Sequence, residues 1–201
     1  MERKCPSCGA GLETPLACSA CGVLIETDDA ENPFEVLGLE PSIDIDPAEA
    51  RKRLRRFTRL VHPDFFATEG GEQLARAERN NALLNHAYDV VSDELRRADW
   101  IVRHLGGPTQ EDLGAMPQEF LMDVMEWNEV LDEASAGSPE IGTLEADLCA
   151  HRESVRRKIH EALDPLPASN SEALADVRRS LNAYRYIDRA LSRIAQMPYS
   201  L

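Results

Sequence analysis

Apolar residues recur at the spacing of an α-helix through most of the chain after residue 32. Asn32 and Asp46 are each followed directly by proline and, three residues on, by glutamate, which is a signal for the start of a helix. The Gly106-Gly107-Pro108 break is the clearest boundary, and the short connections beyond it predict that the last three helices pack as antiparallel neighbours. We therefore predict an all-α fold, with no convincing strand outside the first 22 residues. The predicted helices cover residues 33–37, 47–61, 72–92, 95–105, 117–135, 139–163 and 171–196.

Four of the five cysteines form two pairs, Cys5-x2-Cys8 and Cys18-x2-Cys21, each followed by glycine. Two intervening residues let a tight turn place both sulfurs on one ion, and the glycine tolerates backbone angles that aim amide groups at the sulfurs. Two such turns complete a four-thiolate site with no position for water, so we predict one structural Zn²⁺ per chain. A redox dithiol, an iron–sulfur cluster and disulfides are the alternatives. Cys149 stands alone in a helical pattern, where we expect a core or half-buried thiol.

Composition narrows the classes of partner and the compartment. A formal net charge of −14 disfavours nucleic acid as the main partner, because phosphate binding needs a cationic surface. The sequence has no run of 18 apolar residues and so predicts no membrane span. Because Cys5 follows Met1 almost at once, we expect no signal or transit peptide and a cytoplasmic protein, or a matrix protein if a leader has been removed. Cytoplasmic cysteines stay reduced, which favours ligands or free thiols.

The helix predicted over 47–61 has an apolar face and a basic face, and it runs directly into His62-Pro63-Asp64. Pro63 disfavours helical geometry at His62, so the triplet should lie in a turn at the end of the basic face. A catalytic His–Asp pair finds no support, because no nucleophile motif, phosphate loop or second acid accompanies it. The basic face taken alone is most often a solvated surface. The predicted buried stripe of this helix is Ala50, Leu54, Phe57 and Val61. The basic ridge on its opposite side is Lys52, Arg55, Arg56 and Arg59.

This helical frame resembles a J-domain: four helices, a basic second helix, HPD before the third, and LNHAYDVV on the third. The resemblance implies that His62, Pro63 and Asp64 dock on a DnaK-type chaperone and accelerate its ATP hydrolysis. It also implies that the basic ridge meets an acidic surface of that chaperone. Many J-domains have lysine after HPD, whereas this chain has Phe65-Phe66, so no role is carried over for that lysine.

Three longer stretches, NPFEVLGL, LRRADWIVRHLGG and FLMDVMEWNEVLDEA, together resemble the HscB family of iron–sulfur cluster co-chaperones. HPDFF and the N-terminal cysteines look most like its zinc-bearing, mitochondrial-type branch. The resemblance implies a zinc knuckle at 1–25, a J-domain at 32–107 and a client-binding three-helix bundle at 108–201. Such a protein is not an enzyme: it brings an IscU-type scaffold to an HscA/DnaK-type ATPase. A general J-protein for unfolded chains and a zinc-ribbon nucleic-acid binder are the rival interpretations.

The helix predicted over 117–135 also has two different faces. Phe120, Val124, Trp127 and Leu131 share a stripe that we assign to the core. Methionines among glutamates lie across from it, a composition that suits adaptable contacts; packing of this face on the J-domain is the alternative. In HscB the matching positions bind the scaffold. The resemblance therefore assigns to the client Leu121, Met122, Met125, Glu126, Glu129, Glu133 and Tyr186.

Overall fold

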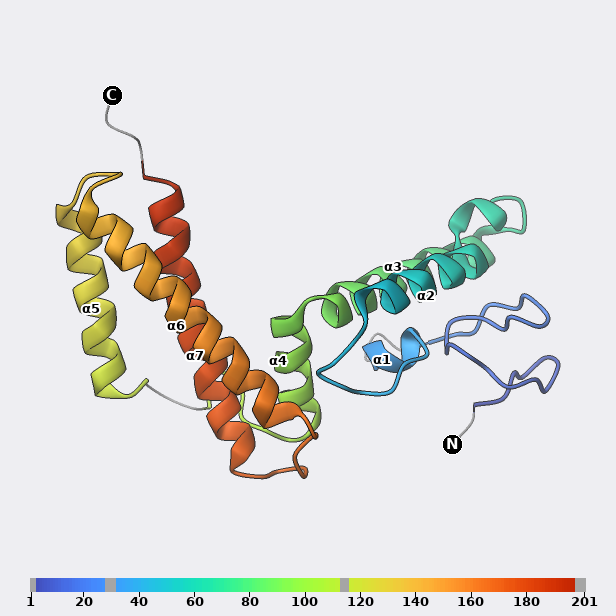
Figure 1. Cartoon of the computed structure of the whole chain (residues 1–201). Coiled ribbons are helices and arrows are strands. Elements are labelled where there is room, and N and C mark those ends of the chain that lie inside the picture. The colour runs from blue at the N-terminus through green and yellow to red at the C-terminus, as the bar shows by residue number, and fades with distance from the viewer. Residues whose placement is uncertain (1–2, 28–31, 113–115, 198–201) are drawn as a thin grey trace. The chain divides into compact units, whose positions relative to one another are not determined.

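The computed structural model describes residues 3–27, 32–112 and 116–197, and the prediction of an all-α fold is confirmed (Figure 1). Within this part of the chain the backbone forms no strand, only the isolated bridges Lys4–Gly11 and Ala17–Leu24 in the cysteine segment. Every predicted helix is present, and the ends differ from the predicted ones by at most two residues. The helices are α1 (Pro33–Val36), α2 (Pro47–Val61), α3 (Gly71–Ser92), α4 (Glu94–His104), α5 (Gln118–Glu133), α6 (Pro139–Leu163) and α7 (Ala173–Ala195), with a 3₁₀ turn η1 (Pro63–Phe65) after α2.

Side-chain caps explain why three of these helices begin where they do. The Asn32 side chain accepts the backbone N–H of Phe34 at 2.9 Å, and Asp46 accepts that of Ala48 at 2.8 Å. Ser138 caps α6 in the same way. In each case proline occupies the first turn, where a missing N–H costs no hydrogen bond. These signals are local, which is why the sequence predicts the helix starts well.

The chain divides into two compact units, residues 1–97 and 98–201. This division lies within α4, before the Gly106-Gly107-Pro108 break, and the predicted domain limits of 1–25, 32–107 and 108–201 stay predictions. In the first unit α2 packs along α3, and α1 and η1 also pack against α3. Ala50, Phe57 and Val61 of the predicted stripe on α2 are buried, while Leu54 is half-buried. The buried core of this unit includes Phe34, Leu37, Ile43, Phe57 and Leu84.

The second unit is built on α6 and α7, which lie side by side, with α5 packed against both (Figure 1). Its buried core includes Leu148, Ile159, Leu163, Leu174 and Ile187. Cys149, next to Leu148, is exposed, so the expectation of a core or half-buried thiol was wrong. The helix turns by about 100° per residue, and Leu148 rather than its neighbour takes the inward position. No helix in the described ranges is both long and apolar enough to cross a membrane.

An ion pair inside the second unit joins the middle of α4 to α7. Arg178 is 1% exposed, and it donates from Nη1 to Asp99 and from Nε to the carbonyl of Pro108 at 2.8 Å. Burial raises the pKa of Asp99, but the hydrogen bond from Arg178 and the charges of Arg178, Arg103 and Arg185 outweigh it, so the pKa lies below its usual range. The charged carboxylate therefore stabilises the fold at neutral pH, and this contribution is lost as the pH falls through the lowered pKa.

Candidate functional site

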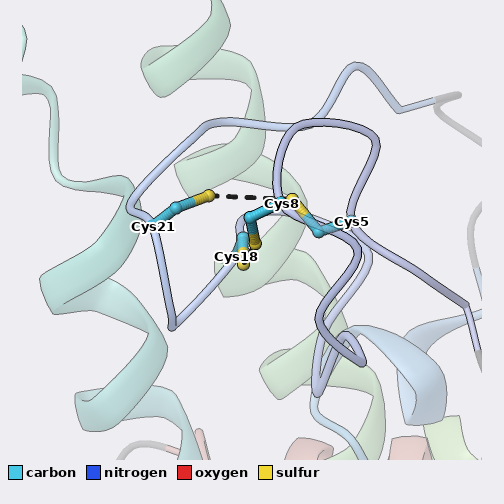
Figure 2. A group of neighbouring side chains, drawn as sticks. All are labelled: Cys5, Cys8, Cys18 and Cys21. Atoms are coloured by element: carbon cyan, nitrogen blue, oxygen red, sulfur yellow. Dashed lines mark hydrogen bonds between the residues drawn. The ribbon is translucent and has the colours of Figure 1, made fainter.

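The four N-terminal cysteines bring their sulfur atoms together (Figure 2). All four Sγ atoms lie within 4.8 Å of one another, and the pairs Cys5–Cys21 and Cys8–Cys18 are 3.7 Å apart. A tetrahedral ion with metal–sulfur bonds of about 2.3 Å requires sulfurs about 3.8 Å apart, whereas a disulfide requires about 2.05 Å. The separation therefore fits four ligands of one metal ion and does not fit disulfides.

Each pair of cysteines lies on the same kind of tight turn. The N–H of Gly9 donates to the carbonyl of Cys5 at 2.9 Å, and the N–H of Gly22 donates to that of Cys18 at 2.8 Å. Both glycines have positive φ, at 75° and 76°, a conformation that a side chain disfavours. The first cysteine of each pair is buried and the second is exposed. The glycine after each CxxC thus has backbone angles that favour glycine, as the sequence predicts.

The thiols influence one another's protonation. The backbone N–H of Cys8 is the main cause that lowers the pKa of Cys5, to about 6. The N–H of Ala10 lowers the pKa of Cys8, but the thiols of Cys21 and Cys5 together with burial raise it to about 12. One thiolate is therefore easy to form in this cluster, whereas the next is opposed by the first. A bound cation would stabilise the thiolates together. Because the thiols must lose their protons to bind it, metal affinity should rise with pH.

Residues 3–27, here called the knuckle, are docked on the first unit by a buried asparagine. Asn80 of α3 is 1% exposed. Its Nδ2 donates to the carbonyls of Leu16 at 2.7 Å and Ile25 at 2.9 Å, and its Oδ1 accepts from the Thr27 hydroxyl at 3.1 Å. Since unmatched amide groups are costly to bury, these bonds fix both ends of the second CxxC loop on α3. Sequence reasoning missed this contact; the available signal was an asparagine at a helical spacing from Ala77, Leu84 and Ala87 on the buried side of α3.

Further contacts join the first half of the knuckle to α1 and α2. The hydroxyl of Thr14 donates to the carbonyl of Val36 at 2.8 Å. Gly38 lies so close to the knuckle that a Cβ there would be 2.5 Å from the carbonyl oxygen of Glu13. The Glu13 carboxylate in turn pairs with Arg56 of the basic ridge at 2.6 Å. The knuckle therefore shares one packed structure with α1, α2 and α3.

All four residues of the predicted basic ridge are exposed on α2. Lys52 pairs with Glu49 at 3.3 Å and Arg56 with Glu13, so these two have carboxylate partners on the protein. Exposed pairs of this kind add little to stability. The ridge thus remains a cationic surface that can meet an acidic partner.

The His62-Pro63-Asp64 triplet forms a turn directly after α2, as its proline predicts. His62 has extended backbone angles, φ −65° and ψ 126°, and Pro63 begins η1. Nδ1 of His62 accepts the N–H of Asp64 at 3.3 Å. The Asp64 carboxylate lies 3.6 Å from the same Nδ1, too far for a hydrogen bond, and its side chain is 86% exposed. The turn therefore offers a carboxylate and a half-exposed imidazole to another molecule.

The predicted client face of α5 is exposed to solvent. Met122 and Met125 are 56% and 63% exposed, unusually high fractions for large apolar side chains. Leu121 is half-buried at the edge of this face. The glutamates of the set, Glu126, Glu129 and Glu133, are exposed as well. The structure thus brings six of the seven predicted client residues onto one helix surface.

Tyr186, the seventh, reaches α5 from a different side. Its ring contacts Phe120 edge-on, with centroids 5.8 Å apart, and it is half-buried on α7. Phe120 also contacts Trp127 at 5.8 Å, and both rings contact His151 of α6. The predicted core stripe of α5 therefore faces α6 and α7. Tyr186 belongs to that aromatic cluster and not to the methionine surface, a contact that wheel positions on two separate helices do not predict.

Comparison with known proteins links both units to one family. A family model described as the HSCB C-terminal oligomerisation domain matches residues 116–195. A co-chaperone protein HscB homolog from Bordetella petrii is 33% identical over 136 residues, which cover 67% of this chain and 80% of that protein. The human iron–sulfur cluster co-chaperone protein HscB is 30% identical over 139 residues, or 66% of this chain and 59% of that protein. The crystal structure of human co-chaperone protein HscB matches with a TM-score of 0.78 at 25% identity, over 96% of this chain and 97% of that chain.

We expect the protein purified without a metal-chelating tag to contain one metal ion per chain. Cys18→Ser should lose that ion, because three thiolates and a hydroxyl no longer complete the site. Cys149→Ser, the matched control, should keep it, because Cys149 is not part of the cluster. Elemental analysis measures the content. Metal-free parent protein, or loss of metal from the Cys149 variant, would contradict the assignment.

Proposed function

Since this chain belongs to the HscB co-chaperone family, we propose that it brings an IscU-type scaffold for iron–sulfur clusters to an HscA/DnaK-type ATPase. The relatives named above are co-chaperones, which are not enzymes, so ATP hydrolysis belongs to the partner. Two surfaces support this proposal, one in each unit: the HPD turn with the basic ridge, and the exposed face of α5. We assign these surfaces to a J-domain at 32–107 and a client-binding bundle at 108–201.

The exposed HPD turn is the observation that carries the proposal. Pro63 ends α2 and holds His62 and Asp64 in a short turn at the end of the basic ridge. A turn whose backbone is already fixed loses little conformational entropy when a partner binds it. The ridge would steer the turn toward an acidic surface of the ATPase, with an effect on association that salt weakens. The contact would favour the ATPase conformation in which hydrolysis is fast.

The client surface would be the α5 face with Leu121, Met122, Met125 and the three glutamates. Methionine side chains are flexible and polarisable, so they fit the uneven surface of a folded partner. The glutamates would surround these apolar contacts with negative charge and favour a partner with basic residues nearby. Tyr186 would contribute indirectly, through the aromatic cluster that packs against the side of α5 opposite the methionines.

We propose Zn²⁺ as the ion of the knuckle, held by Cys5, Cys8, Cys18 and Cys21. Four thiolates leave no open position for water, which is typical of structural zinc. When bound, the ion would supply only cross-linking of the two loops. Asn80, Thr14 and Glu13 then connect this cross-linked segment to α3, α1 and α2. The reduced thiols that such a site needs agree with the cytoplasm or a mitochondrial matrix.

His62→Gln should reduce stimulation of the chaperone's ATPase to the rate of the chaperone alone. Helicity and scaffold affinity should be unchanged, because His62 is half-exposed in a turn and is remote in sequence from α5. The measurement is single-turnover ATP hydrolysis, with circular dichroism and scaffold binding in parallel. His86→Gln, an exposed histidine of α3, is the matched control and should stimulate normally. If the His62 variant stimulates as well as the parent protein, the HPD turn has no part in the function.

Replacing both Met122 and Met125 with serine should lower the affinity for the scaffold by about tenfold or more, because each buried anchor of this kind contributes roughly 1–2 kcal/mol of binding free energy. The free energy of unfolding should change by less than about 0.5 kcal/mol, since both side chains are exposed. Calorimetry and thermal melts separate these effects.

Trp127→Ala should have the opposite effect, lowering the stability of the fold rather than the affinity for the scaffold. Its ring contacts Phe120 and His151, so this change should destabilise the fold more than the methionine pair does. A methionine double variant that melts early and binds scaffold normally would show that the face packs within the protein.

If denatured peptide rather than folded scaffold competes for the α5 face, the protein would be a general co-chaperone for unfolded clients.

A further inference from the structure

Within the described part of the chain, three large apolar side chains are strongly exposed: Phe65, Met122 and Met125. The two methionines lie on the proposed client face. Phe65 is 62% exposed and lies in the other unit, in η1 directly after the HPD triplet. An exposed aromatic ring beside a binding turn calls for an explanation, because large apolar side chains are normally buried.

The turn holds the Phe65 ring next to His62. The N–H of Phe65 donates to the carbonyl of His62 at 3.1 Å, and the N–H of Phe66 donates to that of Pro63 at 2.9 Å. The Phe65 ring meets the His62 imidazole edge-on, with centroids 5.9 Å apart. Phe66 is half-buried, so the two consecutive phenylalanines differ in exposure. The exposed ring is therefore continuous with the imidazole of the HPD turn and is positioned by the same short 3₁₀ segment.

The surroundings of this ring indicate which partner it fits. The turn follows α2, where residues 51–59 include six basic side chains and no acidic one. Lys52, Arg55 and Arg59 are exposed along this helix. A partner complementary to this surface has acidic groups and, next to them, an apolar hollow for one aromatic ring. Aromatic side chains that fill such hollows at the centre of a polar contact are the usual dominant anchors of an interface.

We propose that Phe65 is an apolar anchor that inserts into the DnaK-type ATPase beside the contact made by the HPD turn. This inference rests on the proposed function and adds to it a specificity-determining residue. The basic ridge contributes attraction that salt screens, whereas burial of the Phe65 ring contributes affinity that salt does not weaken. Lysine in place of Phe65 would remove the apolar contribution and add to the electrostatic attraction that salt screens.

The test is a titration of the chaperone's ATPase with parent protein, Phe65→Ser, Phe65→Leu and Phe65→Lys, at low and high salt. Phe65→Ser should raise the half-maximal concentration by about tenfold, with an unchanged maximal rate and an unchanged salt dependence. Phe65→Leu, which stays apolar, should lose much less. Phe65→Lys should approach the parent at low salt and fall behind it at high salt. Thermal melts and scaffold affinity should be the same for all four proteins.

The outcomes separate this inference from the function on which it rests. A parent protein that fails to stimulate any DnaK-type ATPase overturns both. Stimulation by the parent and equal half-maximal concentrations for Phe65→Ser and the parent overturn the anchor alone. A lower maximal rate at an unchanged half-maximal concentration also overturns it, because Phe65 would then act by positioning His62. Loss of scaffold affinity in Phe65→Ser would place the ring in a client contact, which contradicts the anchor as well.

Discussion

Phe57 and Val61 pack the inner side of α2 into the first unit, and their burial turns the basic ridge outward. Pro63 then ends the helix, so the HPD turn begins where the ridge ends. The same constraint operates in α5, where Phe120 and Trp127 face α6 and α7 and leave the methionine face in solvent. In both helices the stripe that must be buried decides which side chains remain for a partner. One amphipathic pattern in each helix therefore sets both its packing and the surface that we propose for a partner.

The knuckle depends on the same unit for its own position. Asn80 satisfies backbone carbonyls on both sides of the second CxxC loop, and its amide would be costly to leave buried without them. Metal binding by the cysteines would therefore be linked to folding of the knuckle onto α3. Because Glu13 of the knuckle pairs with Arg56, the knuckle also contacts the basic ridge. Arg56 consequently differs from Arg55 and Arg59, although the sequence places all three on the same basic ridge.

Sequence reasoning succeeded where the determining interactions are local. Asn32, Asp46 and Ser138 cap helices through neighbours a few residues away, and each CxxC turn is complete within five residues. It did not predict the clamp of Asn80 on the knuckle or the pair of Arg178 with Asp99, because these partners lie more than 50 residues apart in the sequence. The HscB resemblance assigns Tyr186 to the client, but it does not predict the contact of Tyr186 with Phe120, which depends on how α5 and α7 pack. The proposed function rests on the HscB resemblance, because no local pattern in the sequence indicates it.

The proposed function requires both surfaces on one chain, since a scaffold held on α5 is kept near the ATPase only while the HPD turn is engaged. The most direct measurement is ATP hydrolysis by the chaperone with limiting scaffold and a mixture of two defective proteins. One carries His62→Gln and an intact α5 face, and the other carries an intact HPD turn with Met122 and Met125 replaced by serine. The mixture should give less stimulation than the same total concentration of parent protein, because neither chain joins scaffold to ATPase. Full parental stimulation by the mixture would contradict the claim that this protein works by linking its two partners.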